Sequence, residues 1–268
     1  MRRQHTYAGL VRLGLRGLAA TGSVIALLIA WELFARAEVV SAFLLPPLTL
    51  VLERIGKDLI SGALPVQLGL TLYRAVAGFT LAALFGILIG VLMARSKSVS
   101  WFFDPIVSIG FPAPKIAFLP VFILWFGLFD LSKILMTVFA AIFPVIGATA
   151  AATEGVDKYL IWSARNAGAS EGEILWEVVL PAAMPQIITG LQVALPISLI
   201  VTIVSEMVMG GEGLGGNMIG AARFADSVGV FAGIVQIAIA GYLLIKGLEL
   251  IRQGLLVWHQ ETQQLSTF

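Results

Sequence analysis

The sequence of 268 residues contains no cysteine, which excludes disulfide bonds, cysteine-ligated zinc sites and iron–sulfur clusters. Its two histidines, His5 and His259, lie in charged terminal segments, so we expect no metal site. Charged residues are also scarce, at 12% against about 25% in a typical soluble domain. Because 59% of the residues are hydrophobic, the composition is typical of an integral membrane protein. A formal net charge of +1 gives no indication of a nucleic-acid partner.

Recognisable catalytic motifs are missing as well. No Ser/His/Asp set and no pair of carboxylates occurs at catalytic spacing, which argues against an enzyme. The sequence has no G-x-x-x-x-G-K-[ST] segment, so an ATP-driven role would require a second polypeptide. The segment Gly211–Gly216, GEGLGG, has the glycine spacing of a dinucleotide-binding loop, but it follows a long apolar run instead of a strand. We therefore expect it to be a flexible turn outside the membrane, near the exit of a pathway.

What the sequence does contain is long apolar runs. A helix needs about 20 apolar residues to cross a hydrocarbon core of about 30 Å. Six segments are long enough and none alternates like a barrel strand, which predicts an all-α membrane protein with six transmembrane helices. The expected spans, in a single domain over residues 1–268, are Leu18–Ala35, Leu72–Ala94, Phe102–Phe129, Ile134–Ala152, Ile187–Met209 and Val228–Leu250. The basic N-terminus is similar to a signal peptide, but no small-residue cleavage site precedes Glu32, which favours an uncleaved first span.

The distribution of lysine and arginine predicts the orientation of these spans. With six spans both termini lie on one side, and that side holds nine basic residues against five on the other. The nine are Arg2, Arg3, Arg12, Arg16, Arg95, Lys97, Lys158, Arg165 and Arg252, and the five are Arg36, Arg54, Lys57, Lys133 and Arg223. Because positively charged loops stay in the cytoplasm, both termini and the loop over residues 153–185 are predicted to be cytoplasmic.

The third span is unusual because it holds four prolines, Pro105, Pro112, Pro114 and Pro120. Proline removes a backbone donor, so this helix must be kinked or broken, and its freed carbonyls need partners or a water-filled cavity. Lys115 lies among the prolines, where a charge at mid-span costs about 2.5–3.5 kcal/mol and normally faces a cavity or a counter-charge.

We assign Lys115, Pro112, Pro114 and Glu206, near the outer end of the fifth span, to a candidate translocation pathway. The alternative is that the two charges pair with each other, with backbone or with interfacial water. Glu32 and Arg74 are interpreted as packing or snorkelling charges. Outside the membrane, Leu48–Ile60 follows two prolines and is predicted to form a short amphipathic helix near the interface.

A long amphipathic loop, SARNAGASEGEILWEVVLPAAMP, runs from Ser163 to Pro185 between two apolar segments. A first short helix over residues 156–167 should end at Gly168 in the left-handed conformation. Ser170 and Glu173 have the spacing of a capping box that starts a second helix, which Pro181 should end. A loop that only connects two spans is usually shorter, so we interpret this loop as a docking element. The alternative is a surface helix that merely covers the end of the bundle.

The loop resembles the EAA loop of ABC importer permease subunits. In that pattern Ala164 is the last alanine, Gly168 the glycine, Val178 the aliphatic residue and Leu180–Pro181 the closing pair. Trp162 and Ser163 stand where the pattern has glutamate and alanine. Four further segments are similar to the branch that imports taurine, alkanesulfonates, nitrate and related small organic anions. They are Thr71–Gly90, Pro112–Gly127, Leu180–Leu195 and Ser205–Ile219.

The resemblance implies a type I importer permease in the bacterial inner membrane, with five core helices besides the N-terminal span. Two copies would form a homodimer among membrane lipids, with two cytoplasmic ATPase subunits and a periplasmic or lipid-anchored solute-binding protein. ATP and Mg would bind to the ATPases, and this chain would hold no cofactor. Residues 153–185 would contain the coupling helix, with its tip at Ala164, Gly168, Ala169 and Ser170 and the rest of the motif at Glu173, Val178, Leu180 and Pro181.

Three alternatives stay open at this point. The same importer class could carry an aromatic carboxylate, a thiamine precursor or an amino acid. An ion-coupled secondary transporter would need no ATPase, but such proteins usually show paired broken helices, and only one is evident here. A non-transporting membrane scaffold could use the same loop, but it would not need the proline-rich span or its lysine.

Overall fold

The computed structural model describes residues 22–256, which form helices and connecting turns without any strand, so the predicted all-α class is confirmed. An N-terminal helix covers residues 22–36, and residues 18–21 of the first expected span lie outside the described part. The elements that follow are α2 (Leu48–Ile60), α3 (Ala63–Arg95), α4 (Lys97–Gly110), the 3-10 helix η1 (Lys115–Phe118), α5 (Leu119–Phe126), α6 (Asp130–Glu154), α7 (Lys158–Asn166), α8 (Glu171–Glu173), the π-helix η2 (Ile174–Val179), α9 (Leu180–Met209), α10 (Leu214–Arg223) and α11 (Ser227–Leu255).

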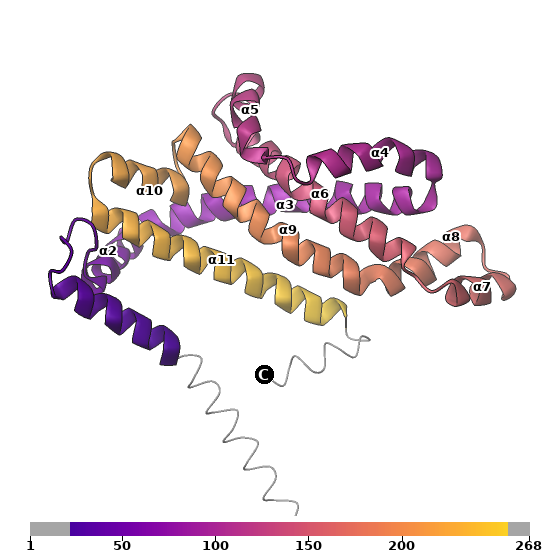
Figure 1. Cartoon of the computed structure of the whole chain (residues 1–268), viewed down its shortest axis with the longest axis horizontal. Helices are drawn as coiled ribbons and strands as arrows, with labels where there is room; N and C mark the ends of the chain where they lie inside the picture. The colour runs from indigo at the N-terminus through magenta and orange to yellow at the C-terminus, as the bar shows by residue number, and fades with distance from the viewer. Residues whose placement is uncertain (1–21, 257–268) are drawn as a thin grey trace, which may run out of the picture.

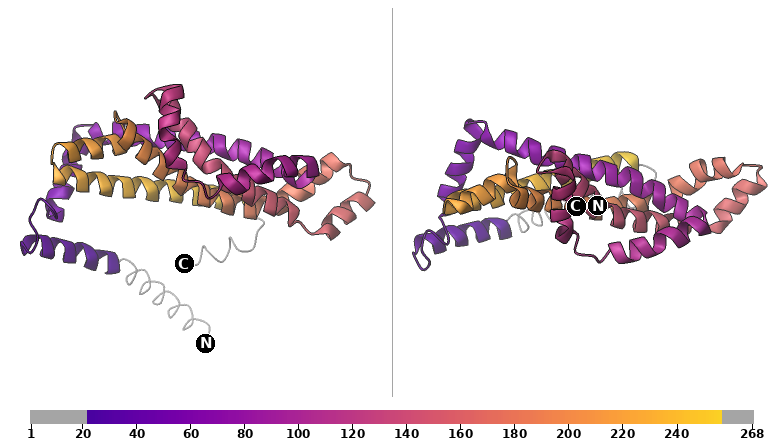
Figure 2. Two further views of the ribbon diagram at one scale, coloured as in Figure 1. Left: turned by 45° about the horizontal axis from the view of Figure 1, so that its top comes forward. Right: turned by 90° about the horizontal axis from the view of Figure 1, so that it is seen from above.

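The long helices lie side by side in an elongated bundle (Figures 1 and 2). Helix α6 packs most extensively against α3 and α9, so these three helices form the centre of the fold. Helices α2 and α10 lie at one end of the bundle, and α7 and α8 project from the opposite end (Figure 1). The predicted amphipathic helix is confirmed as α2, with the expected bounds.

Small residues on α3 allow α6 to approach closely. Gly78, Ala82, Gly86 and Gly90 recur every four residues, which places them on one face of the helix. A Cβ atom on Gly78 or Gly90 would lie 2.6 Å from the Cβ atom of a threonine on α6. Small residues at such intervals are typical of helix pairs packed in a membrane, where the driving force is van der Waals contact.

Four helices of the described part are long and apolar enough to cross a membrane, or five if a bent pair is counted as one span. The four are Ala63–Arg95, Asp130–Glu154, Glu171–Met209 and Ser227–Leu255, which overlap four of the expected spans. The third expected span is the bent pair: Lys97–Gly110 and Lys115–Phe126 meet at an angle of 97°. The predicted break is therefore confirmed, and Pro112 and Pro114 lie within it.

The prediction that Pro181 ends a helix is wrong. A helix runs without interruption from Glu171 to Met209, and Pro181 lies at the start of its α9 part. The six residues before α9 form the π-helix η2. A π turn bonds each residue to the fifth one before it, which shifts the hydrogen-bond ladder just before a residue that has no N–H to donate. The loop and the fifth span are thus one continuous element.

Candidate functional site

The loop at the end of the bundle begins with a well-capped helix. The carboxylate of Asp157 accepts a hydrogen bond from the backbone N–H of Tyr159, which fixes the start of α7. At the other end, Gly168 has a φ of 89°. The N–H of Gly168 bonds to the carbonyl of Arg165, and that of Ala169 bonds to the carbonyl of Ala164. These two bonds form a Schellman motif, and they confirm the predicted left-handed cap.

The predicted capping box is also confirmed. The Ser170 hydroxyl accepts a hydrogen bond from the N–H of Glu173, and the Glu173 carboxylate accepts one from the N–H of Ser170. The Ser170 hydroxyl also donates to the Glu173 carboxylate, and this bond, together with the one from the Ser170 N–H, lowers the pKa of Glu173. The second helix of the loop therefore starts at a fixed residue.

The structure divides the expected tip into two parts. Gly168, Ser170 and Glu173 are exposed, and nothing lies within 4 Å of where a Cβ atom on Gly168 would stand. Ala164 and Ala169 instead pack against a hydrophobic cluster that includes Ile174 and Val179. Val178 in η2 and the first two residues of α9, Leu180 and Pro181, are partly buried.

Three exposed aromatic residues on the same loop were not assigned to the docking surface from the sequence. The side chains of Tyr159, Trp162 and Trp176 are 72%, 53% and 71% exposed. The rings of Tyr159 and Trp162 meet edge to face, with centroids 5.5 Å apart. Large exposed aromatics are enriched at the energetic centres of protein interfaces. The departure from the motif at Trp162 would have been the signal to look for them.

One glutamate connects the loop to the bundle. The carboxylate of Glu171 accepts a hydrogen bond from Arg165 at 2.5 Å and one from Arg95, in the last turn of α3, at 3.0 Å. Arg165 and then Arg95 lower the pKa of Glu171. The loop is therefore attached to α3 by an ion pair, in addition to its covalent links to α6 and α9.

The expected pathway residues of the third span lie at its break. Pro112 and Pro114 are exposed, and Lys115 is partly exposed. The ammonium of Lys115 donates to the carbonyl of Phe111 and lies 5.6 Å and 5.7 Å from the ring centroids of Phe111 and Phe143. Lys115 and Glu206 are not paired with each other: Lys115 is satisfied by backbone and ring faces at the break.

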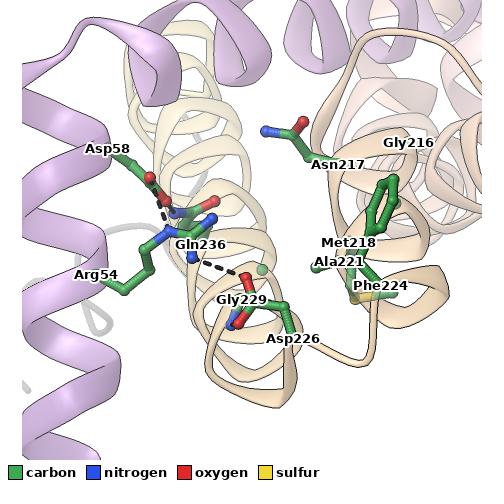
Figure 3. Close-up of a pocket in the computed structure, with 12 residues that line it drawn as sticks. Arg54, Asp58, Gly216, Asn217, Met218, Ala221, Phe224, Asp226, Gly229 and Gln236 are labelled. Atoms are coloured by element: carbon green, nitrogen blue, oxygen red, sulfur yellow. Dashed lines mark hydrogen bonds and ion pairs between the residues drawn. The ribbon is translucent and has the colours of Figure 1, made fainter.

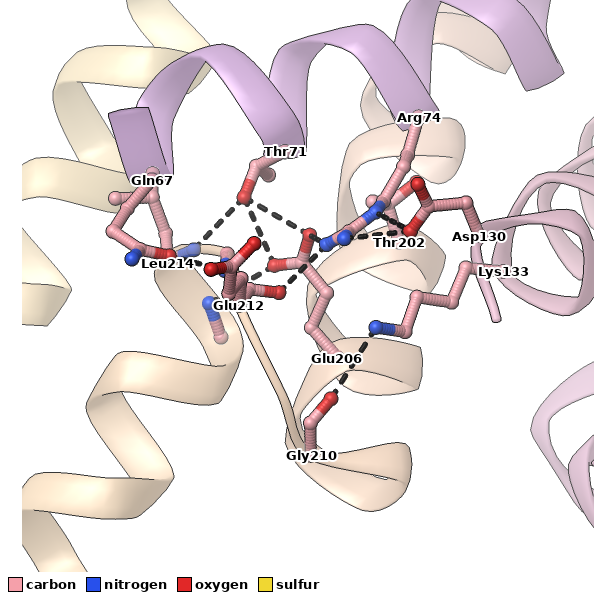
Figure 4. A network of polar contacts seen from close by, with 12 residues as sticks. Gln67, Thr71, Arg74, Asp130, Lys133, Thr202, Glu206, Gly210, Glu212 and Leu214 are labelled. Carbon is pink, nitrogen blue, oxygen red and sulfur yellow. Dashed lines mark hydrogen bonds and ion pairs between the residues drawn. The ribbon is translucent and has the colours of Figure 1, made fainter. Parts of the chain in front are cut away.

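Glu206 lies in a buried polar network that joins four helices (Figure 4). Its side chain is fully buried and accepts a bond from Arg74 on α3 at 2.6 Å. The Thr71 hydroxyl lies 2.9 and 3.0 Å from the two carboxylate oxygens, and the N–H of Gly215 on α10 donates to one of them at 3.0 Å. Because Glu206 is fully buried, it contributes no surface to a pathway in this conformation.

Of the two interpretations of Arg74, the packing charge is confirmed and the snorkelling charge is wrong. Arg74 is only 3% exposed, and it also bonds to Asp130 at the start of α6 and to the backbone carbonyl of Glu212. Snorkelling places a charge in water, whereas these carboxylates and this carbonyl replace water around the guanidinium. Sequence reasoning missed the network because Thr71 and Arg74 lie more than 130 residues from Glu206 and meet it only when α3 packs against α9.

The glycine-rich segment 211–216 is not the flexible turn that we expected. The N–H groups of Gly213, Leu214 and Gly215 donate to Gln67, Thr71 and Glu206. A Cβ atom on Gly213 would collide with the Glu206 carboxylate. The glycines therefore allow the backbone to wrap around a buried anion, which also lies favourably at the N-terminus of α10.

A second polar contact lies between α2, α10 and α11, around a hollow of about 310 Å³ (Figure 3). Arg54 on α2 pairs with Asp58 at 3.1 Å and with Asp226, just before α11, at 2.8 Å. The amide of Gln236 donates to the other oxygen of Asp58. These bonds hold the amphipathic helix to the end of the bundle that carries the glycine-rich segment.

Comparison with known proteins places these features in a family. A family model described as "Binding-protein-dependent transport system inner membrane component" matches residues 82–253. The chain is 34% identical over 247 residues to the taurine transport system permease protein TauC of Escherichia coli (strain K12), with 90% of each chain covered. It is 36% identical over 246 residues to the putative aliphatic sulfonates transport permease protein SsuC of Bacillus subtilis (strain 168), covering 91% of this chain and 87% of the relative.

Two further similarities are more distant. The formylaminopyrimidine transport permease protein ThiX of Halalkalibacterium halodurans is 29% identical over 236 residues, which cover 88% of this chain and 93% of the relative. Among solved structures, the MetNI methionine ABC transporter in an inward-facing conformation matches with a TM-score of 0.63 and 18% identity. That match covers 70% of this chain and 94% of the other, and it supports the fold alone.

Proposed function

The chain belongs to the family of inner membrane components of binding-protein-dependent transport systems, and on that premise we propose that it moves a small sulfonate-type anion, such as taurine or an alkanesulfonate. It is a transport subunit and not an enzyme, because the ATPase of such an ABC importer is a separate chain. The observation that carries the proposal is the identity of 34–36%, over about nine-tenths of the chain, to permeases for taurine and aliphatic sulfonates. Nitrate is a further candidate within the same anion class.

A different ligand is favoured by one observation only. The permease for formylaminopyrimidine matches nearly as much of the chain, but at 29% identity. The sulfonate proposal therefore has the stronger support, and a pyrimidine is the second candidate.

The loop over residues 153–185 is the proposed docking element for the ATPase. Its exposed surface combines a narrow tip at Gly168 and Ser170 with the aromatic pair Tyr159 and Trp162, which suits it to a groove on a partner. The continuous helix from Glu171 to Met209 would carry a displacement of the loop directly into the membrane. The Glu171–Arg95 pair would carry the same displacement to α3.

The proposal extends to the rest of the assembly. Two copies of the chain would enclose the pathway, with one ATPase seated on each loop and with ATP and Mg bound to the ATPases. The loop and both termini would face the cytoplasm, and the opposite end, with α2 and α10, would receive the solute-binding protein. The break between α4 and α5, with Pro112, Pro114 and Lys115, would line the pathway, because irregular backbone at membrane depth requires a protein or water-filled environment.

Co-purification tests the docking proposal. The tagged chain, extracted in mild detergent from its host, should bring an ATPase subunit in equal amount. Gly168→Trp should lose that subunit, because a bulky side chain would stand at the exposed tip. Gly168→Asn is the matched control, since asparagine tolerates the left-handed conformation and adds little bulk. A chain that purifies alone, and still moves a sulfonate into vesicles without ATP, would instead favour a secondary transporter.

A further inference from the structure

Lys133 is a buried cation with unused hydrogen-bonding capacity. It lies in the first turn of α6 and is 3% exposed. Its ammonium donates to the carbonyl of Gly210 at 3.2 Å. An ammonium has three N–H donors, and over residues 22–256 no ion pair joins Lys133 to a carboxylate. The carboxylates of Glu206, Asp130 and Glu212 attract this charge from a distance, but none of them accepts a hydrogen bond from the ammonium. An anion with acceptor oxygens beside Lys133 would use the donors that remain.

The neighbouring cation is not available for this purpose. The guanidinium of Arg74 already bonds to Asp130, to Glu206 and to the carbonyl of Glu212. Figure 4 shows the Lys133 side chain apart from these bonds, with its ammonium directed toward Gly210. The two cations therefore differ: Arg74 holds the network together, and Lys133 has donors to spare.

Lys133 lines a hollow of about 540 Å³ between the start of α6 and the segment that follows α9. That volume is in the usual range for a small-molecule site. Its charged lining residues are Arg74, Asp130, Lys133 and Glu212, of which Arg74 and Asp130 are paired with each other. Its large apolar lining residues are Leu128, Phe129, Leu131 and Met209. A ligand that bonds to Lys133 and also contacts these apolar residues has an anionic head and a short hydrocarbon tail.

We propose that this hollow binds the sulfonate group of the transported anion, with Lys133 as the residue that selects the negative charge. The inference deepens the proposed function and rests on it. The hollow is lined by Arg74 of the polar network and by Gly211 and Glu212 of the glycine-rich segment. The helix that follows this segment, α10, lies at the end of the bundle assigned to the binding protein, where an incoming anion would arrive first (Figure 1). The ammonium donates to the sulfonate oxygens, and the apolar lining residues favour an alkanesulfonate over nitrate.

Glu212 provides a control within the same hollow. Its carboxylate is exposed and lines the hollow, and over the described residues its side chain accepts no hydrogen bond. A carboxylate near an anion site weakens anion binding by like-charge repulsion. Glu212→Gln should therefore bind the sulfonate as tightly as the native chain or more tightly, whereas Lys133→Gln should bind it more weakly. The two substitutions remove charges of opposite sign and thus have opposite predicted effects.

The test uses the complex of the full chain with its ATPase, in nanodiscs of phosphatidylcholine. The probes are ethanesulfonate and hexanesulfonate, with nitrate for comparison, and the readouts are calorimetric titration and the rise in melting temperature with ligand. Lys133→Gln should weaken ethanesulfonate binding by about tenfold or more, because it removes a charge-assisted bond. Lys133→Arg should retain most of the binding. Hexanesulfonate should bind more tightly than ethanesulfonate, and nitrate least tightly.

Three results would overturn the proposal. Equal sulfonate affinity in the native chain and Lys133→Gln would remove Lys133 from any site, and Lys133→Met serves as a second neutral variant if Lys133→Gln does not fold. Sulfonate binding that is unaffected by Lys133→Gln but abolished by Glu212→Gln would show that the site depends on the carboxylate and not on the ammonium. Lys133-dependent stabilisation by phosphatidylglycerol nanodiscs, without any by a soluble sulfonate, would assign the hollow to a lipid head group. If the native complex with its binding protein and ATP carries no sulfonate at all, it is the proposed function that fails.

Discussion

Replacing Glu206 with glutamine should strongly destabilise the fold, because Glu206 is the acceptor around which α3, α9 and α10 meet. The native carboxylate is fully buried and accepts bonds from Thr71, Arg74 and Gly215. Glutamine keeps one oxygen, but its amide group turns two donors toward a site that is already filled with donors. The charge of Arg74 would then be balanced by Asp130 alone.

The size of the effect follows from these contacts. Removing one partner of a buried ion pair typically costs about 3–5 kcal/mol. Asp130 still compensates Arg74 and one acceptor remains, so we expect about 3 kcal/mol, at the lower end of that range. For a chain of this length, 1 kcal/mol corresponds to about 2–4 °C, so the melting temperature should fall by about 6–12 °C.

The assay is thermal unfolding of the purified chain in one detergent, followed by fluorescence. Glu249→Gln is the matched control: the same substitution breaks the exposed pair with Lys246, which is worth about 0–1 kcal/mol. If the melting temperature fell no further in Glu206→Gln than in Glu249→Gln, the prediction would be refuted, because Glu206 would then contribute no more to stability than a surface carboxylate does.

Two further predictions concern the glycine-rich segment and the loop. Gly213→Ala should have a melting temperature well below that of the native chain, because residue 213 has a φ of 117° and its new Cβ atom would collide with the Glu206 carboxylate. Gly220→Ala, with open space around it, should unfold at the native temperature or slightly above. Equal melting temperatures for the two variants would contradict this prediction. The second prediction is a pH dependence: Arg165 and Arg95 lower the pKa of Glu171, so its ion pairs are complete above its ordinary value of 4.5 and are lost as the pH falls through the lowered pKa. Amide hydrogen exchange of the loop, corrected for the intrinsic effect of pH, should therefore accelerate on acidification in the native chain and not in Glu171→Gln. The same pH profile in both proteins would show that the Glu171 carboxylate does not stabilise the loop.

Local sequence rules predicted the parts of the structure that depend on near neighbours. The bounds of α2, the left-handed Gly168, the capping box at Ser170 and the break at Pro112 and Pro114 each follow from residues at most a few positions apart. Their physical causes, a proline without a donor or a glycine without a Cβ atom, act within one or two turns. Such features require no knowledge of the fold.

Two of the three misread features depend on contacts between distant segments. Snorkelling was a possible interpretation of Arg74 because nothing near it in the sequence is acidic, and its partner Glu206 lies 132 residues away. The segment 211–216 looked flexible because its glycines were read without the anion that orders them. Pro181 looked like a helix end because the compensating π turn at Ile174–Val179 has no recognised sequence pattern. For Arg74 and the segment 211–216 a tertiary partner decided the outcome, whereas for Pro181 a local change in backbone hydrogen bonding did.

The most direct test of the account is uptake of labelled ethanesulfonate into proteoliposomes that contain the chain, its ATPase and its binding protein. We predict uptake only when ATP is enclosed with the ATPase and binding protein is present on the opposite side. Gly168→Trp should abolish uptake and Gly168→Asn should preserve it. Uptake that proceeds without ATP, or that is the same in Gly168→Trp, would contradict the claim that this loop couples the ATPase to the membrane helices.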